Sequence, residues 1–161
     1  MRRSTRTWAV IIAALPAIAT ACQKSDGINQ FHPTSVAGWD CHDTLLFHLP
    51  PTSAAHDFDI QVQARITPKF PLDELWLVVE QSFGEPDSTS RLHYADTAKI
   101  RLSDANGILT GNGRHLLEYQ HPIRFVHLHE GEGGQVRIRQ VSDYEKIPGV
   151  HDIGIAIVPI K

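Results

Sequence analysis

A strict alternation of apolar and polar residues from Phe58 to Ile66 is the feature that most constrains the fold. The apolar members are Phe58, Ile60, Val62, Ala64 and Ile66, and every residue between them is polar or charged. Successive side chains of a strand point to opposite faces, so this period of two predicts a strand with one buried face and one wet face. Such a strand needs a second layer of structure to cover its apolar face.

Short segments with strand character, separated by turn residues, make up most of the remaining chain. We expect strands at 44–49, 58–66, 75–79, 98–102, 116–119, 123–128, 136–139 and 153–158. The continuous apolar run 75–79 predicts a strand covered on both faces. No long segment has a helical period, although 143–148 could hold one helical turn. The sequence therefore predicts an all-β fold, an antiparallel β-sandwich of jelly-roll type with about eight strands and little helix.

The first 21 residues have the composition of a secretory signal peptide. Three arginines precede an uncharged apolar run from Trp8 to Ala21, which is shorter than the roughly 20 residues that span a bilayer. The segment 19–22, Ala-Thr-Ala-Cys, resembles a bacterial lipobox. This resemblance implies cleavage before Cys22 and acylation of that cysteine on its sulfur and its amino group. The alternative is an ordinary signal peptide that is cleaved nearby, with Cys22 incidental.

The expected domain organisation follows from this signal. We predict a lipoprotein signal peptide at 1–21, a lipidated tether at 22–35 and a β-sandwich domain at 36–161. The start of the tether resembles the Lys/Ser-plus-acid signal that sends some bacteroidete lipoproteins to the cell surface. A generic polar linker explains the same residues equally well. Either way we expect a lipid-anchored protein of the cell envelope, at the outer membrane.

Charge and cysteine content restrict the partners. The mature part from Cys22 onward has 12 basic and 18 acidic residues, a net charge of −6. This balance argues against nucleic-acid binding, which depends on Lys and Arg at phosphates. We expect acyl chains on Cys22 to hold the protein at the membrane. A lipidated Cys22 leaves Cys41 without a disulfide partner, so Cys41 is expected to be a small buried or half-buried residue.

The residue types of catalysis and metal binding are present, but they lack the spacing of known sites. His127 and His129 share a strand face, as two ligands of one metal would, yet no third ligand follows at cupin spacing. The Gly-x-Ser-x-Gly elbow and a Gly-rich phosphate loop are both absent from the sequence. We therefore predict no metal, no cofactor and no catalytic residue. Trp39, Phe70 and Trp76 could form a stacking platform for a ligand, or they could pack in and around the core.

A series of spaced features resembles the family of gliding-motility lipoproteins called GldH. The features are Phe31, Trp39, Phe47, Arg65, Phe70-Pro71, 75–77, Asp96-Thr97, 102–104, Gly107, 111–113 and 147–155. The resemblance implies a lipidated, non-enzymatic protein associated with gliding, with Cys22 as its functional position. We therefore predict an envelope-machine component that contacts other envelope or gliding proteins. The alternative is an envelope lipoprotein that binds a glycan or peptide on its aromatic residues.

Overall fold

The computed structural model describes residues 27–86, 89 and 91–160, and this part of the chain folds into strands without a helix. The prediction of an all-β fold is confirmed. Ten strands are present in the described residues: β1 (Ile28–Pro33), β2 (Trp39–Asp40), β3 (Leu45–Leu49), β4 (His56–Ile66), β5 (Glu74–Gly84), β6 (Leu92–Arg101), β7 (Leu117–Leu128), β8 (Gly133–Gln140), β9 (Lys146–Ile147) and β10 (Val150–Pro159).

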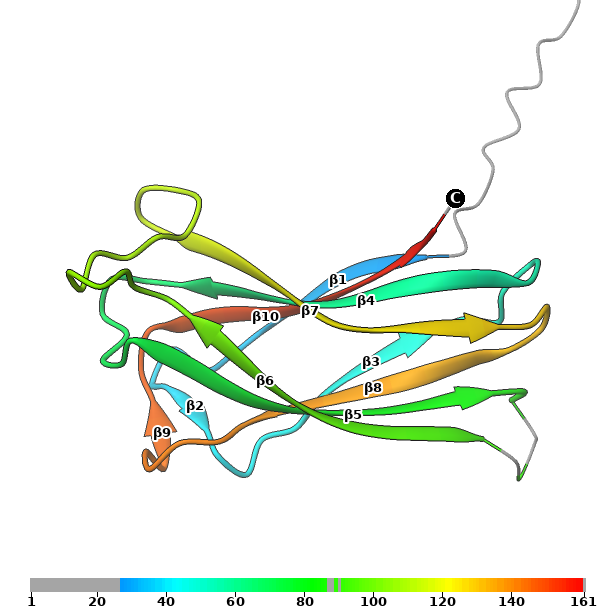
Figure 1. Cartoon of the computed structure of the whole chain (residues 1–161). Coiled ribbons are helices and arrows are strands. Elements are labelled where there is room, and N and C mark those ends of the chain that lie inside the picture. The colour runs from blue at the N-terminus through cyan, green and yellow to red at the C-terminus, as the bar shows by residue number, and fades with distance from the viewer. Residues whose placement is uncertain (1–26, 87–88, 90, 161) are drawn as a thin grey trace, which may run out of the picture.

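The strands form two packed layers and one small ribbon (Figure 1). The first sheet has the order β1-β10-β4-β7, and the second has the order β3-β8-β5-β6. We call them the β4 sheet and the β5 sheet. The ribbon pairs β2 with β9 at one end of the sandwich. Every paired strand runs antiparallel to its neighbour.

The core lies between the two sheets, as the alternation of β4 predicts. The five apolar residues of the 58–66 pattern are buried, and they join one cluster with Leu75, Leu77 and Val79 of β5. The run 75–79 is not covered on both faces, which corrects that expectation. Trp76 between the buried leucines is 40% exposed, because no strand of the described residues covers the outer face of the β5 sheet.

The boundary between tether and domain differs from the expected one. Residues 28–33, which we placed in the tether, form edge strand β1 and pair with β10 from Ile157 to Asp152. The Phe31 ring of β1 lies on Gly154, where a Cβ atom would come within 2.7 Å of it. The Arg65 guanidinium lies over this ring, 3.7 Å from its centroid. The contacts of the Phe31 ring with Gly154 and Arg65 thus hold in place a segment whose composition is that of a linker.

Strand β7 and the 143–148 segment also depart from expectation. The two short strands expected around Pro122 are one strand. Its pairing with β4 has a bulge, because Arg124 stands opposite Ile60 whereas Pro122 stands opposite the next residue, Gln61. Proline cannot donate a ladder hydrogen bond, so it is tolerated here because β7 is an edge strand. The segment 143–148 has no helical turn and instead contributes β9.

Candidate interaction surface

The three aromatic residues singled out from the sequence lie in different environments. Trp39 of β2 and Phe70 are buried in the core, where their rings are unavailable to a ligand. Trp76 of β5 is exposed on the outer face of the β5 sheet. The structure therefore does not bring the three together as one stacking platform.

Trp76 instead stands beside the exposed Val141, and the exposed Tyr144 follows three residues later; we call these three residues the Trp76 patch. Val141 follows β8 and donates its backbone N–H to the Trp76 carbonyl at 2.9 Å. Tyr144 lies in the following turn, where the Gln140 side-chain amide donates to its carbonyl at 3.1 Å. The exposed fractions are 40% for Trp76, 44% for Val141 and 40% for Tyr144. Large apolar side chains gathered at a surface are typical of a contact site.

Charged neighbours fix the orientation of Trp76. The Lys99 ammonium lies 5.0 Å from the ring centroid and 2.8 Å from a Glu74 carboxylate oxygen. The same carboxylate accepts a hydrogen bond from the indole Nε1 at 3.3 Å. The hydrogen bond from Lys99, the largest cause, lowers the pKa of Glu74 from its ordinary value. The patch thus has an apolar centre with a charged rim, the composition common at protein interfaces.

A shallow hollow of about 370 Å³ lies further along the outer face of the β5 sheet. It exists because Ser82 and Ala95 have small side chains between larger neighbours on adjacent strands. Glu80 and Arg137 stand opposite each other in the register of β5 and β8, and His93 completes the polar lining. Its open form and mixed charge fit a polar side chain of a partner better than an enclosed small molecule.

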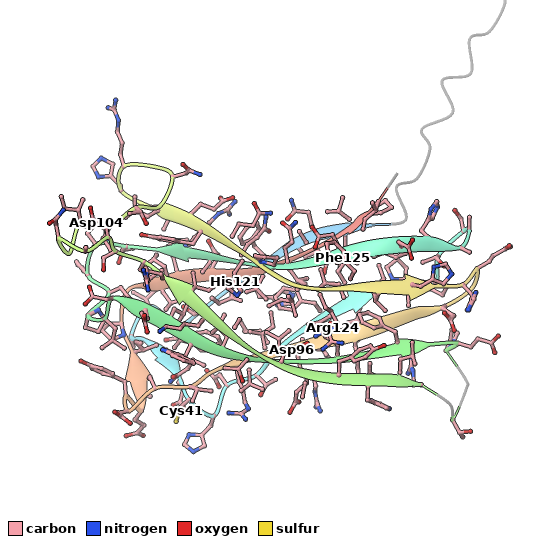
Figure 2. The ribbon with its side chains drawn as sticks, viewed as in Figure 1. Cys41, Asp96, Asp104, His121, Arg124 and Phe125 are labelled. Carbon is pink, nitrogen blue, oxygen red and sulfur yellow. The ribbon has the colours of Figure 1, made fainter. Side chains whose placement is uncertain are left out.

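The seam between edge strands β6 and β7 contains an ion pair that sequence reasoning missed. Arg124 donates from Nε and Nη2 to the two carboxylate oxygens of Asp96, at 2.8 and 2.7 Å. The buried side chain of Gln81 donates to the same carboxylate at 2.7 Å. The Arg124 guanidinium also stacks on Tyr94, 4.0 Å from its centroid. Figure 2 shows Asp96 and Arg124 side by side between the two sheets.

The electrostatics of this pair follow from the geometry. The hydrogen bonds from Arg124 are the largest cause that lowers the pKa of Asp96, and the positive charge of Arg124 lowers it further. Burial of the carboxylate acts in the opposite direction but does not outweigh them. The hydrogen bonds that Arg124 donates to Asp96 raise the pKa of Arg124. Both groups therefore stay charged at neutral pH. The pair links two sheets, and it is part of the scaffold, not of the outer surface.

The two histidines considered as metal ligands lie together, with ring centroids 5.0 Å apart, but among the described residues no third potential ligand joins them. His127 faces outward and pairs with Asp57 at 2.8 Å, while Glu132 accepts a hydrogen bond from the His129 backbone N–H. Within the described ranges, one group of three potential ligands has its donor atoms within 4.8 Å: Asp40, Cys41 and His42. His42 Nδ1 lies 3.0 Å from Asp40 and 3.4 Å from Cys41, so hydrogen bonds account for this turn. Cys41 is half-buried and free, as expected.

Cys22 precedes the described residues, so the predicted lipidation site lies outside them. The part of the chain that the structure describes contains no helix with the length and hydropathy of a membrane span.

Solved structures provide only weak likenesses. An aminopeptidase from a marine sediment Thaumarchaeota archaeon aligns with 71% of this chain at 15% identity and a TM-score of 0.39. This chain spans 23% of that enzyme's length. The Eiger TNF protein of S. frugiperda aligns with 81% of this chain and 92% of its own, at 11% identity and a TM-score of 0.29. No curated protein matches the sequence.

The fold and its exposed features define an all-β sandwich domain with candidate contact surfaces on its outer faces. A family model described as GldH lipoprotein matches residues 27–157. The chain therefore belongs to the GldH lipoprotein family, whose members are lipoproteins of the gliding-motility type. The resemblance seen in the sequence is confirmed, and it covers nearly all of the described domain.

Proposed function

We propose that this chain is a lipid-anchored, non-enzymatic component of the gliding motility apparatus, held at the outer membrane by acyl chains on Cys22. The family match over 27–157 carries the proposal, and the lipobox-like segment 19–22 supports it. In this proposal residues 1–21 are the cleaved signal and 22–27 are the tether. The sandwich from β1 onward is the working domain.

The Trp76 patch is the proposed contact for a protein of the same machinery. It lies near the start of β5 and the end of β8, whereas the described chain begins beside the end of β10. The Trp76 patch and the start of the described chain are therefore at opposite ends of the sandwich (Figure 1). Ten residue steps along β5 correspond to roughly 30 Å. A tether at one end therefore leaves the Trp76 patch free to meet a protein away from the bilayer.

Metabolic labelling tests the anchor. Cells that express the full chain receive an alkyne fatty acid, and incorporation is read after click chemistry. Wild type and Cys41→Ser should both carry label and fractionate with membranes. Cys22→Ser should lose the label and remain unprocessed. Equal label on wild type and Cys22→Ser would refute the anchoring part of the proposal.

A further inference from the structure

The end of the domain nearest the tether has an exposed apolar patch on the outer face of the β4 sheet. Phe125 of β7 is 71% exposed, Val158 of β10 is 47% exposed and Ile160 is 44% exposed. Asp59 of β4 stands between Phe125 and Val158 in the strand register, so these two side chains share one face of the sheet. The Ile160 backbone N–H donates to the Asp57 carbonyl at 2.7 Å, which holds Ile160 beside the same end of β4.

This anchor-proximal patch is bordered by the exposed Asp57–His127 pair on one side and by uncharged residues on the other. Its neighbours on the face include Asn29, Ala156, Gln61 and Pro122, which are uncharged. The acid Asp59 is half-buried and accepts a hydrogen bond from the Gln61 side chain. Further charged residues of the same face, Arg65, Glu118 and Asp152, lie at the other end of β4. The exposed apolar side chains of this face are therefore gathered at the end of the sheet nearest the tether.

The length of the tether places this patch close to the bilayer. Gly27 is five residue steps from Cys22, and a fully extended chain of that length reaches about 17 Å. Gly27 is packed against the Ile157 carbonyl, next to Val158. Phe125 is two strand spacings from β10, or roughly 10 Å. In Figure 2 Phe125 lies on the upper sheet, to which β1 at the start of the described residues also belongs.

We propose that Phe125, Val158 and Ile160 rest in the headgroup region of the membrane to which Cys22 is anchored, so that the outer face of the β4 sheet lies toward the lipid. This orientation rests on the proposed lipidation of Cys22. The acyl chains supply the affinity, and they hold the patch at high local concentration near the bilayer. Three apolar side chains then suffice to select one orientation of the domain.

Spin labels on the anchored protein test this orientation. The full chain with Cys41→Ser is produced in a bacterium that lipidates it and is reconstituted in vesicles of phosphatidylethanolamine and phosphatidylglycerol. Single variants Phe125→Cys and Val158→Cys receive the label. Leu46→Cys is the matched control, because Leu46 is an exposed apolar residue on the outer face of the β5 sheet. Collision with oxygen, which partitions into lipid, is compared with collision with a water-soluble nickel complex.

The proposal predicts an oxygen-to-nickel ratio several-fold higher at positions 125 and 158 than at position 46. Equal ratios at the three positions would overturn the proposal. Labels at 125 and 158 that neither reagent reaches would also overturn it and would indicate a protein contact instead. Flotation and mass measurement of the same preparation report lipidation separately. A lipidated, floating protein with equal ratios refutes only the orientation. A protein without lipid refutes the anchor and the orientation together.

Discussion

Arg124 of β7 and Asp96 of β6 form a two-point ion pair across the open side of the sandwich. Each residue lies on an edge strand, and each points toward the core. Inward-facing charges discourage an edge strand from pairing with another chain, because burying them unpaired would be costly. Here each charge compensates the other. The pair therefore closes the seam between the sheets and protects two edges at once.

Loss of Arg124 is predicted to destabilise the domain more than loss of an outer-face arginine. Arg124→Ala removes two of the hydrogen bonds to Asp96, keeps the one from Gln81 and takes the guanidinium away from Tyr94. Hydrogen bonds to charged groups contribute about 1.5–3 kcal/mol each, so a total loss of a few kcal/mol is expected. Urea unfolding provides the measurement, and Arg137→Ala is the control. Equal midpoints for the two variants would contradict this account of the seam.

The pair also predicts how stability depends on pH. The pKa of Asp96 is lowered in the folded state, mainly by the hydrogen bonds from Arg124, from an ordinary value of 3.8. A lowered folded-state pKa contributes stability above the unfolded-state pKa and loses it as pH falls through the folded-state value. The free energy of unfolding of wild type should therefore exceed that of Asp96→Asn by a constant amount from neutral pH down to about 5. Below about pH 4 this difference in stability should shrink.

Thermal unfolding of both proteins across that range gives the measurement. Asp40, Glu74 and Asp104 also have lowered pKa values and titrate in both proteins, so the difference between the curves isolates Asp96. A margin that grows as the pH falls would have the wrong sign for this mechanism.

The sequence predicted the core strands because their signal is local. Alternation at 58–66 identified β4 and its buried face without any knowledge of partners. The Arg124–Asp96 pair has no such signal, since 28 residues separate its members and each resembles an ordinary surface charge. Strand β1 was assigned to the tether because its order comes from β10, Gly154 and Arg65, all distant in sequence.

The exposed Trp76 shows a second limit of sequence reasoning. A run of apolar residues at 75–79 looks the same whether one or two layers cover the strand. Trp76 is accommodated at the surface because Lys99 and Glu74 flank it across and along the sheet. Those contacts depend on the register of β5 with β6, in which Trp76 stands opposite Lys99. Composition alone could not separate Trp76 from the buried Trp39.

Truncation of Ile60 tests the core of the sandwich. Ile60 is fully buried near the middle of β4 and stands between Ile157 and Arg124 in the register. Ile60→Ala should lower stability by about 2–5 kcal/mol, through lost transfer energy and a cavity. Asp59→Ala, one residue away on the outer face, should change it little, although it removes the acceptor of the Gln61 hydrogen bond. Urea titration distinguishes the two, and equal effects would refute the assigned faces of β4.

A side chain at position 154 is predicted to loosen β1. The Cβ of Gly154→Ala would lie 2.7 Å from the Phe31 ring and 3.0 Å from the Gln30 carbonyl oxygen. Phe31 must then move away from its place under Arg65. Hydrogen exchange should become faster for the amides of β1 and change little for those of β5. Gln120→Ala, on the outer face of β7, is the control, and unaltered protection of β1 in Gly154→Ala would show that the close packing there is unimportant.

The Trp76 patch gives the prediction closest to function. A photoreactive amino acid in place of Tyr144 should crosslink to a discrete envelope protein in living cells, and Trp76→Ala should reduce that adduct several-fold. Truncation of an aromatic contact residue commonly costs more than about 1 kcal/mol of binding free energy. Leu46→Ala, also exposed on the outer face of the β5 sheet, should leave the adduct unchanged. Matching thermal midpoints would show that both variants remain folded. If the adduct forms at full yield in Trp76→Ala, the partner's contact lies elsewhere. If instead the protein captures a glycan and Trp76→Ala abolishes that capture, a ligand-binding role for this surface is favoured.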